Sequence, residues 1–220
     1  MNTEIKKRIF TSLILLSLLI SMYLYSFIMV MSLIIIMIII WIEFYALIAK
    51  IIIKDSIKDK FLRFFYKFIS LLYLSLLTFF IFYIESDYPH LKIYLFYSIL
   101  VAILSDIGGL VIGKTFKGKK LTKISPNKTI SGSIGSFIFS LFLVPIFYTK
   151  IIEHNFLNLI LITILISFIS QLGDLFVSYL KRQANVKDTS DLLPGHGGFL
   201  DRTDGIIFAI PTGILLLNFF

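Results

Sequence analysis

A polar, glycine-rich segment runs from Ser178 to Asp204, close to the C-terminus of a chain that is otherwise mostly apolar. Five of the thirteen acidic residues lie between Asp174 and Asp204, together with four of the 21 basic residues. Carboxylates suit hard cations such as Mg²⁺, whereas lysine and arginine bind phosphate groups. This concentration of charge predicts chemistry on a charged substrate at a membrane surface.

The first carboxylate of this region lies on a predicted helix. Four polar residues have the i, i+3, i+7, i+10 spacing of one helical face: Gln171, Asp174, Ser178 and Lys181. A bare charge deep in a membrane span costs about 2.5–3.5 kcal/mol on insertion scales. Asp174 therefore requires compensation by a metal ion, a polar cavity or Lys181, and a structural ion pair or a snorkelling acid near the interface is the simpler alternative.

A second acidic pair, Asp201 and Asp204, follows the glycine-rich stretch. The two residues would face the same way in the first turn of the last helix, where helix capping is the alternative role. Between the acidic groups lies Pro194-Gly195-His196-Gly197-Gly198, whose backbone N–H groups could cradle an anion. His196 could bind phosphate or assist proton transfer, although a simple turn explains the same residues.

A second polar concentration occupies the middle of the chain. Asp106 is a further acid inside or at the end of a span, and a basic loop follows it. Its bases include four that suit a triphosphate: Lys119, Lys120, Lys123 and Lys128. The glycine pattern is not that of a Walker A loop. Ser131 and Gly135 form a small-xxx-small pair, which close helix packing explains without a ligand.

Composition identifies the solvent of most of the chain. The 220 residues are 58% hydrophobic, with a mean hydropathy of +0.94. Soluble domains are closer to half apolar, so the bilayer must surround most of this chain. The absence of Cys excludes disulfides, thiolate metal sites and a Cys nucleophile. The net charge of +8 fits loops that meet anionic lipid, and no nucleic-acid partner is expected.

These observations predict an all-α, polytopic membrane protein with about seven spans and a single integral membrane domain, 1–220. The N-terminal spans would occupy 1–92 and the catalytic portion 93–220. The apolar run 9–49 divides into two spans near residues 23–26, the first of them retained and not cleaved. Further spans are expected at 68–84, 93–113, 129–149, 156–180 and 205–220.

The distribution of bases predicts the orientation. Segments 1–8, 50–67, 114–128 and 181–204 hold 19 of the 21 Lys and Arg residues, which places them in the cytoplasm. The expected location is the inner (plasma) membrane, with the catalytic loops on the cytoplasmic side. Segment 50–67 is interpreted as an ordinary positive-inside loop in preference to an amphipathic surface helix.

The order Q-x-G-D-L-x-x-S-x-x-K-R, K-D and L-P-G-H-G-G-x-L-D-R-x-D resembles the signature of the phosphatidate cytidylyltransferases, or CDP-diacylglycerol synthases. In this chain the match runs from Gln171 to Asp204. A second match is Ser105-Asp106 with Ser125-Pro126-x-Lys128-Thr129 and Gly132. The two regions cover about half of the chain. The family commonly has an aromatic residue and Glu where this chain has Ile130 and Ser131, so no role of that Glu carries over.

The resemblance implies that CTP and phosphatidic acid give CDP-diacylglycerol and pyrophosphate, with Mg²⁺, a monovalent cation such as K⁺ and a homodimer. It implies a metal site formed by Asp174, Ser178 and Asp201. The implied catalytic residues are Asp174, Asp201, Lys181, Arg182, His196 and Asp204. The implied substrate-binding residues are Asp106, Ser125, Lys128, Asp188, Gly195, Gly197, Gly198 and Arg202.

Two alternatives remain open. A CTP-dependent polyprenol or phytol kinase would phosphorylate a neutral alcohol, which requires a base, and would release CDP. A small ion-coupled transporter would use Asp106 and Asp174 as intramembrane ion sites. The acids, however, gather around one long loop and not at the midplane of several spans.

Overall fold

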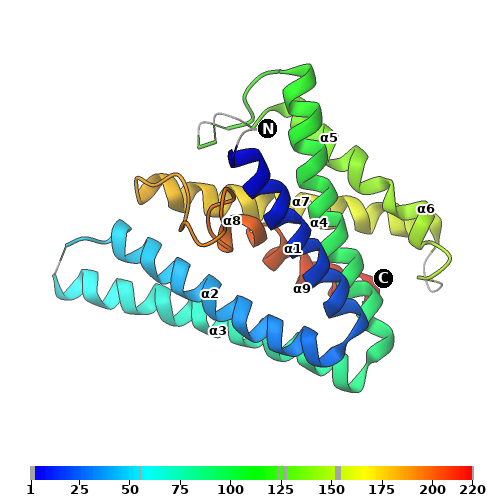
Figure 1. The fold of residues 1–220 in the computed structure, drawn as a ribbon, viewed down its shortest axis with the longest axis horizontal. Coiled ribbons are helices and arrows are strands. Elements are labelled where there is room, and N and C mark those ends of the chain that lie inside the picture. The colour runs from blue at the N-terminus through cyan, green and yellow to red at the C-terminus, as the bar shows by residue number, and fades with distance from the viewer. Residues whose placement is uncertain (1–2, 55, 123, 126–127, 152–154, 220) are drawn as a thin grey trace. The chain divides into compact units, whose positions relative to one another are not determined.

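The computed structural model describes residues 3–54, 56–122, 124–125, 128–151 and 155–219 (Figure 1). Lys123 and Pro126, which belong to the basic loop and to its motif, lie outside these ranges. The described chain is helical, and its elements in order are α1 (Thr3–Leu24), α2 (Ser26–Ile51), α3 (Ile57–Asp87), η1 (Pro89–Leu91), α4 (Lys92–Phe116), α5 (Ile130–Leu141), α6 (Leu143–Phe147), α7 (Phe156–Gln183), α8 (Leu200–Thr203) and α9 (Ile206–Phe219). The predicted all-α class is therefore confirmed.

Six segments of the described chain are long and apolar enough to cross a membrane. The predicted break near residues 23–26 is confirmed, because α1 ends at Leu24 and α2 begins at Ser26. The predicted seventh span corresponds to α9, which has 14 residues and contains Pro211. At 1.5 Å per residue, such a helix extends about 21 Å, less than the roughly 30 Å hydrocarbon core. The count of seven spans stays a prediction.

The prediction of a loop over 50–67 is wrong for most of that segment. Helix α3 begins at Ile57 and continues for 31 residues without interruption. Its first turns combine lysines with phenylalanines at helical spacing and contain neither Gly nor Pro, so nothing stops the helix before the apolar part begins. The bases of this segment thus extend a spanning helix beyond its apolar part.

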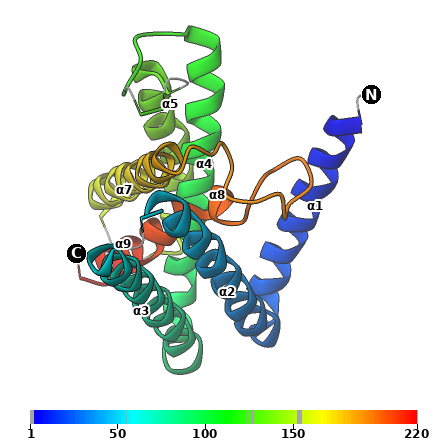
Figure 2. The same ribbon diagram turned by 90° about the vertical axis from the view of Figure 1, so that its left-hand side faces the viewer.

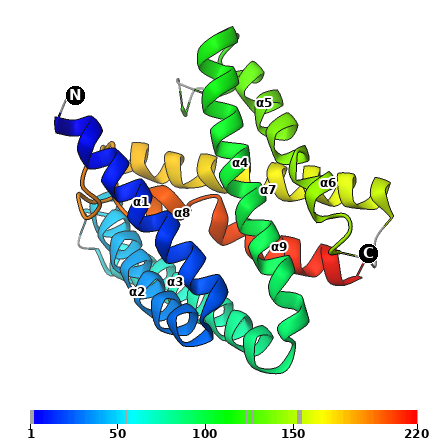
Figure 3. The ribbon, with the colours of Figure 1, turned by 45° about the vertical axis from the view of Figure 1, so that its right-hand side comes forward.

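The chain forms two compact units, which are described separately. Unit 1 comprises residues 1–87 and 180–203, and unit 2 comprises residues 88–179 and 204–220. In unit 1, α2 and α3 run side by side along their lengths (Figures 1 and 3). Helix α1 packs on α2, and the short helix α8 also contacts α2. Helix α2 is therefore the common support of this unit.

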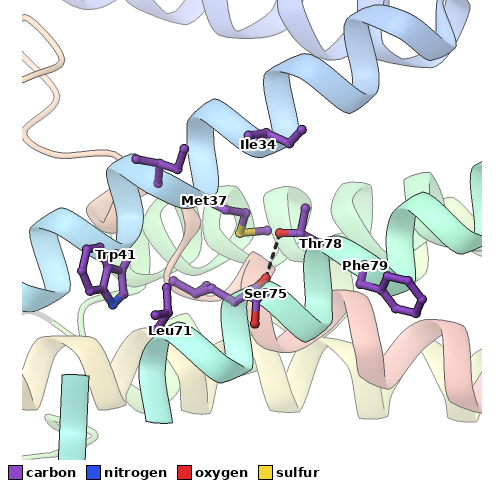
Figure 4. A pocket seen from close by; sticks show the side chains of 9 residues that line it. Ile34, Met37, Trp41, Leu71, Ser75, Thr78 and Phe79 are labelled. Carbon is purple, nitrogen blue, oxygen red and sulfur yellow. Dashed lines mark hydrogen bonds between the residues drawn. The ribbon is translucent and has the colours of Figure 1, made fainter. Parts of the chain in front are cut away.

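Helices α2 and α3 border an apolar groove of about 350 Å³ (Figure 4). Trp41, Met37 and Phe79 are among the nine residues that line it. Ser75 and Thr78, its hydroxyl residues, donate back to carbonyl groups of α3 itself at 3.0 and 2.8 Å. Such a lining suits hydrocarbon and gives a phosphate group no counter-charge.

Unit 2 is built on close packing between α4 and α5. A Cβ atom added to Gly108 would lie 2.6 Å from the Cβ of Phe139 and would collide with the carbonyl oxygen of Gly135. Gly135 and Gly132 are buried in the same contact. Small residues let two helix backbones approach closely. Such packing matters in a membrane, because lipid gives helices no hydrophobic driving force to associate. The packing interpretation of the glycine pattern is correct, and its centre is Gly108 and Gly135.

Helix α7 joins this core through buried hydroxyl groups. Ser105 of α4 lies 3.0 Å from Ser167 of α7, and Tyr97 lies 2.5 Å from Thr163. A hydroxyl group inside an apolar layer must find a polar partner, so these pairs fix how α4 and α7 face each other.

Replacing Gly108 by Ala should destabilise unit 2. The new methyl group meets backbone and Cβ atoms that cannot move independently, and such overpacking costs about 1–3 kcal/mol. Gly109→Ala is the matched control, because its Cβ would meet the Ser136 hydroxyl, a side-chain group, at 2.8 Å and the Gly132 carbonyl oxygen at the ordinary contact distance of 3.7 Å. Thermal unfolding in detergent should show a lower Tm for G108A than for G109A. Equal Tm values would contradict the proposed packing.

Candidate active site

The polar segment that precedes α8 begins with a defined end to α7. Asn185 adopts a positive φ of 54°, and the N–H of Val186 donates to the carbonyl of Lys181 at 3.0 Å. This six-to-one bond with a left-handed residue is a common way to end a helix, and Asn tolerates that conformation. The chain therefore leaves α7 just after Lys181 and Arg182.

The Pro-Gly-His-Gly-Gly stretch forms a tight turn. Pro194 fixes the first corner, Gly195 has φ 77°, and the N–H of His196 donates to the carbonyl of Leu193 at 2.8 Å. This is the pattern of a type II turn, which requires a positive φ at its third residue. Gly197, at φ 80°, accepts from the Leu193 N–H at 2.8 Å and closes the loop. The turn interpretation of this motif is confirmed, whereas its predicted role in anion binding stays a prediction.

Asp201 lies at the centre of the polar segment. One carboxylate oxygen accepts from the Lys181 ammonium at 2.6 Å. The other accepts from the N–H of Thr189 at 2.7 Å, from its hydroxyl at 2.9 Å and from the N–H of Gly198 at 3.0 Å. Only 3% of the Asp201 side chain is exposed. This carboxylate thus fastens the segment to the end of α7.

The predicted participants His196 and Arg202 also lie in this loop. The Arg202 guanidinium donates two hydrogen bonds to the backbone carbonyl of His196, at 2.9 and 2.7 Å. Nε2 of the imidazole lies 3.5 Å from the Ser12 hydroxyl of α1. Partial burial, followed by the charges of Arg202 and Arg8, lowers the pKa of His196, although a carbonyl at Pro194 acts in the opposite direction. The lowered pKa favours the neutral form of the imidazole at neutral pH.

A small hairpin positions Lys128 in unit 2. The N–H of Leu121 donates to the carbonyl of Lys128 at 2.8 Å, and Lys120 pairs with Thr129. The Thr129 hydroxyl then caps α5 by accepting from the N–H of Gly132 at 3.0 Å. Lys128 therefore stands immediately before the first turn of α5, where its ammonium forms an ion pair with Asp174 of α7.

Helix α7 confirms the predicted polar face. Ser178 donates to the Asp174 carboxylate at 3.3 Å, and Gln171 accepts from Ser133 of α5 at 2.6 Å. The residue that compensates Asp174 is Lys128, whereas Lys181 pairs with Asp201. The sequence suggested Lys181 because it lies on the same helical face as Asp174. In the structure Lys128, from a segment distant in the sequence, contacts Asp174 instead. A structural ion pair was one of the simpler interpretations of Asp174, and the structure contains such a pair with Lys128.

The predicted site residues are distributed over both units. Unit 1 holds Lys181, Arg182, Asp188, Gly195, His196, Gly197, Gly198, Asp201 and Arg202. Unit 2 holds Asp106, Ser125, Lys128, Asp174, Ser178 and Asp204. Ser125 lies in the hairpin, where its carbonyl accepts from the Lys128 N–H at 3.1 Å. Arg182, Asp188 and Asp106 are exposed.

The expectation that Asp201 and Asp204 share the first turn of the last helix is wrong. Asp201 lies in the separate helix α8, and Asp204 lies in the turn that precedes α9. Gly205 follows it in the same turn, and glycine is needed there because an added Cβ would lie 2.9 Å from the Ser170 carbonyl oxygen. Asp204 is buried, and one of its carboxylate oxygens accepts from the N–H of Gly205 at 2.9 Å.

Sequence reasoning missed several residues of unit 1. Glu43 of α2 contacts both Thr189 and Ser190 in the polar segment, at 3.0 and 2.6 Å. Thr11 of α1 donates to the carbonyl of Pro194 at 2.9 Å. A signal existed for Glu43, because it is the lone acid in a 26-residue apolar helix, and an ionisable residue inside a span suggests function. No such signal distinguishes Thr11.

The ion pairs Lys128–Asp174 and Lys181–Asp201 bring together groups that can bind a phosphate-containing substrate. Basic side chains beside carboxylates can neutralise phosphate groups while the carboxylates keep the bases in place. In the described residues, no group of three or more His, Asp or Glu side chains could hold a metal ion by itself. A metal there would need substrate oxygens as ligands, which is how Mg²⁺ commonly binds with phosphates.

The sequence of this chain matches a known protein family. The family described as "Cytidylyltransferase family" matches residues 1–220. A phosphatidate cytidylyltransferase of Bacillus subtilis (strain 168) is 42% identical over 129 residues, which cover 58% of this chain and 48% of that protein. One of Staphylococcus haemolyticus (strain JCSC1435) is 45% identical over 137 residues, 60% of this chain and 51% of that protein. The chain spans about half the length of the curated relatives it matches.

The stability that Asp201 contributes should depend on pH in a defined direction. Burial acts to raise the pKa of Asp201, but the hydrogen bonds from Lys181, Thr189 and Gly198, with the charge of Lys181, lower it below 3.8. A lowered pKa stabilises the folded state above the unfolded value, and this contribution is lost as the pH falls through the folded value. The Tm difference between wild type and Asp201→Asn should be constant from about pH 7 to 5 and shrink below about pH 4. A difference that stays constant down to about pH 3 would contradict the lowered pKa.

Proposed function

The chain belongs to the cytidylyltransferase family, and on this premise we propose that it transfers the cytidylyl group of CTP to phosphatidic acid. The products are CDP-diacylglycerol and pyrophosphate. The observation that carries the proposal is the whole-chain family match, together with relatives named phosphatidate cytidylyltransferase. The helices capable of crossing a membrane fit a lipid substrate.

The chemistry requires neutralisation of charge more than it requires a base. A phosphate oxygen of phosphatidic acid attacks the α-phosphorus of CTP, a new O–P bond forms, and the bond to the β-phosphate oxygen breaks with pyrophosphate as leaving group. The nucleophile is already an anion at neutral pH, so the obstacles are anion repulsion and the charge that develops on pyrophosphate. The Lys128 ammonium, which lies just before α5 and pairs with Asp174, is a suitable counter-charge in unit 2. Lys181 and Arg182 are suitable ones in unit 1.

Mg²⁺ belongs to the proposal as a cofactor. Asp174 and Ser178 offer oxygen ligands one helical turn apart, and 23% of the Asp174 side chain is exposed. When bound, the ion would supply charge neutralisation to the phosphates. Asp201 fits less well, because Lys181 and three further donors already occupy its oxygens. Its share in a metal site, and the roles of K⁺ and of a homodimer, stay predictions.

The proposed location is the cell membrane, with the catalytic loops on the cytoplasmic side. The support for this orientation is the charge bias, since 19 of 21 Lys and Arg residues lie in segments assigned to one side. CTP is soluble and phosphatidic acid is a membrane lipid, so a site at the boundary would give both substrates access.

The reaction can be tested by following two labels on CTP. Purified protein in detergent micelles receives phosphatidic acid, Mg²⁺ and CTP labelled either in cytosine or in the γ-phosphate. The proposal predicts that the cytosine label enters the organic phase and that the γ-label leaves as pyrophosphate. Transfer of the γ-label to an added polyprenol, with release of CDP, would instead identify a kinase. An absence of CTP turnover with ion uptake in vesicles would identify a transporter.

Lysine substitutions should separate a site residue from an ordinary surface base. Lys128→Met removes the positive charge opposite Asp174, and kcat/KM for CTP should fall about a hundredfold, as for loss of a charged transition-state contact. Lys150→Met is the matched control, because it removes the same charge from an exposed position and should keep wild-type kinetics. Equal rates of the two variants in the cytosine-label assay would remove Lys128 from the proposed site.

A further inference from the structure

Glu43 is a buried acid in the middle of an otherwise apolar helix. It lies on α2, and only 5% of the residue is exposed. A buried carboxylate is costly unless hydrogen bonds replace its lost hydration. The groups that replace it come from a segment about 150 residues later in the sequence, which unit 1 brings against α2.

Both oxygens of Glu43 accept hydrogen bonds from this segment. Oε1 accepts from the Ser190 hydroxyl at 2.6 Å and from the N–H of Phe199 at 3.0 Å. Oε2 accepts from the N–H of Leu200 at 2.7 Å and from the Thr189 hydroxyl at 3.0 Å. The carboxylate thus holds both ends of the polar segment, at residues 189–190 and at the first turn of α8. Carboxylate oxygens accept hydrogen bonds, and the backbone N–H groups of Phe199 and Leu200 can only donate them.

Thr189 connects Glu43 to Asp201. Its hydroxyl lies 3.0 Å from the Glu43 carboxylate and 2.9 Å from the Asp201 carboxylate, and it has one proton to donate. Gly198 lies against the same group, since an added Cβ would lie 2.6 and 2.7 Å from the two oxygens of Glu43. The position of Asp201, and of the Lys181 ammonium paired with it, therefore depends on a residue of the second helix.

Helix α1 contributes a separate contact through Thr11, whose hydroxyl also lies 2.8 Å from the carbonyl of Lys7 in its own helix. Figure 2 shows the loop before α8 reaching α1, where Thr11 donates to the carbonyl of Pro194 at 2.9 Å. This contact fixes the tip of the turn and leaves residues 189–190 and 199–200 to Glu43. The two attachments can therefore be removed independently.

We propose that Glu43 is a positioning residue for cytidylyl transfer, which holds segment 189–200 in the conformation that keeps Asp201 paired with Lys181, a base suited to the substrate phosphates. The inference rests on the proposed function for its catalytic half. Its structural half, that Glu43 fixes the loop, stands on the hydrogen bonds from Ser190, Phe199 and Leu200 and on the contact with Thr189. The N-terminal helices then do more than anchor the chain in the membrane, because one of them shapes the reactive segment.

The amide variant Glu43→Gln tests the role of the charge at constant volume. A glutamine side chain keeps one acceptor oxygen and places an NH2 group at the other position. In either orientation of the amide, the N–H of Phe199 or of Leu200 faces a donor and loses its acceptor. Glu85→Gln is the matched control, since it makes the same change on α3 of the same unit.

The natural absence of cysteine provides a direct readout of the loop. Leu200→Cys places a thiol at a position that is 1% exposed, and Leu192→Cys places one at a position that is 53% exposed. A water-soluble maleimide should label Cys at position 192 quickly in every background. Glu43→Gln should raise the labelling rate at position 200 at least tenfold, whereas Glu85→Gln should not change it.

Kinetics on the same preparations test the catalytic half. After correction for the folded fraction, Glu43→Gln should lower kcat at least tenfold and change the KM for CTP less than threefold. Ser190→Ala removes one donor only, so it should give intermediate labelling and activity even if the Gln variant does not accumulate.

Three outcomes would overturn the inference, each at a different point. Unchanged labelling at position 200 in Glu43→Gln would show that Glu43 does not hold the loop. Faster labelling with an unchanged kcat would show that transfer does not use this loop conformation. A wild-type protein without cytidylyl transfer would overturn the proposed function and the catalytic half, while the labelling would still decide the structural half.

Discussion

The burial of two carboxylates, Glu43 and Asp201, governs the polar part of unit 1. A carboxylate removed from water must recover several hydrogen bonds, and backbone N–H groups of an irregular loop must find acceptors. In unit 1 the N–H groups of the loop supply the hydrogen bonds that the carboxylates need, and the carboxylates are the acceptors that these N–H groups need. Glu43 takes the N–H groups of Phe199 and Leu200, and Asp201 takes those of Thr189 and Gly198. The loop therefore has a defined conformation although it contains three glycines within four residues.

In unit 2 the charged group on an apolar helix is Asp174, and an ion pair compensates it. Asp174 lies on a spanning helix, and the Lys128 ammonium on the neighbouring hairpin compensates its charge. The close approach of α4 and α5 at Gly108 and Gly135 sets where that hairpin stands. Helix packing, which needs no ligand, thus determines where a base proposed to meet CTP lies. In both units, charge that is costly in an apolar setting is kept because it is paired.

Much of the fold could be predicted from the sequence, because spanning helices depend on local composition. The apolar runs predicted the all-α class, and the break between α1 and α2 was placed correctly near Tyr25. The polar face of α7 followed from helical spacing. The start of α3 at Ile57 was not predicted, because a basic segment reads equally well as a loop or as a helix that extends beyond the bilayer.

The site was less accessible to sequence reasoning, because its contacts join distant segments. Periodicity on one helix suggested Lys181 as the partner of Asp174, whereas the partner is Lys128, 46 residues earlier. Glu43 and Thr189 are 146 residues apart, and no local pattern links them. The need for glycine at position 205, where a Cβ would collide with Ser170, is likewise a tertiary property. The sequence therefore predicted which residues contribute charge to the site, but it did not predict which of them contact each other.

Hydrogen exchange of individual amides in the wild-type protein tests the central claim most directly. The account requires that two buried carboxylates hold the backbone N–H groups of Thr189, Gly198, Phe199 and Leu200. These four amides should exchange about a hundredfold more slowly than that of the exposed Gly195 in the same loop, because exchange requires the hydrogen bonds to open. Exchange of all five amides at the same rate would contradict the account, since the loop would then be free of both carboxylates.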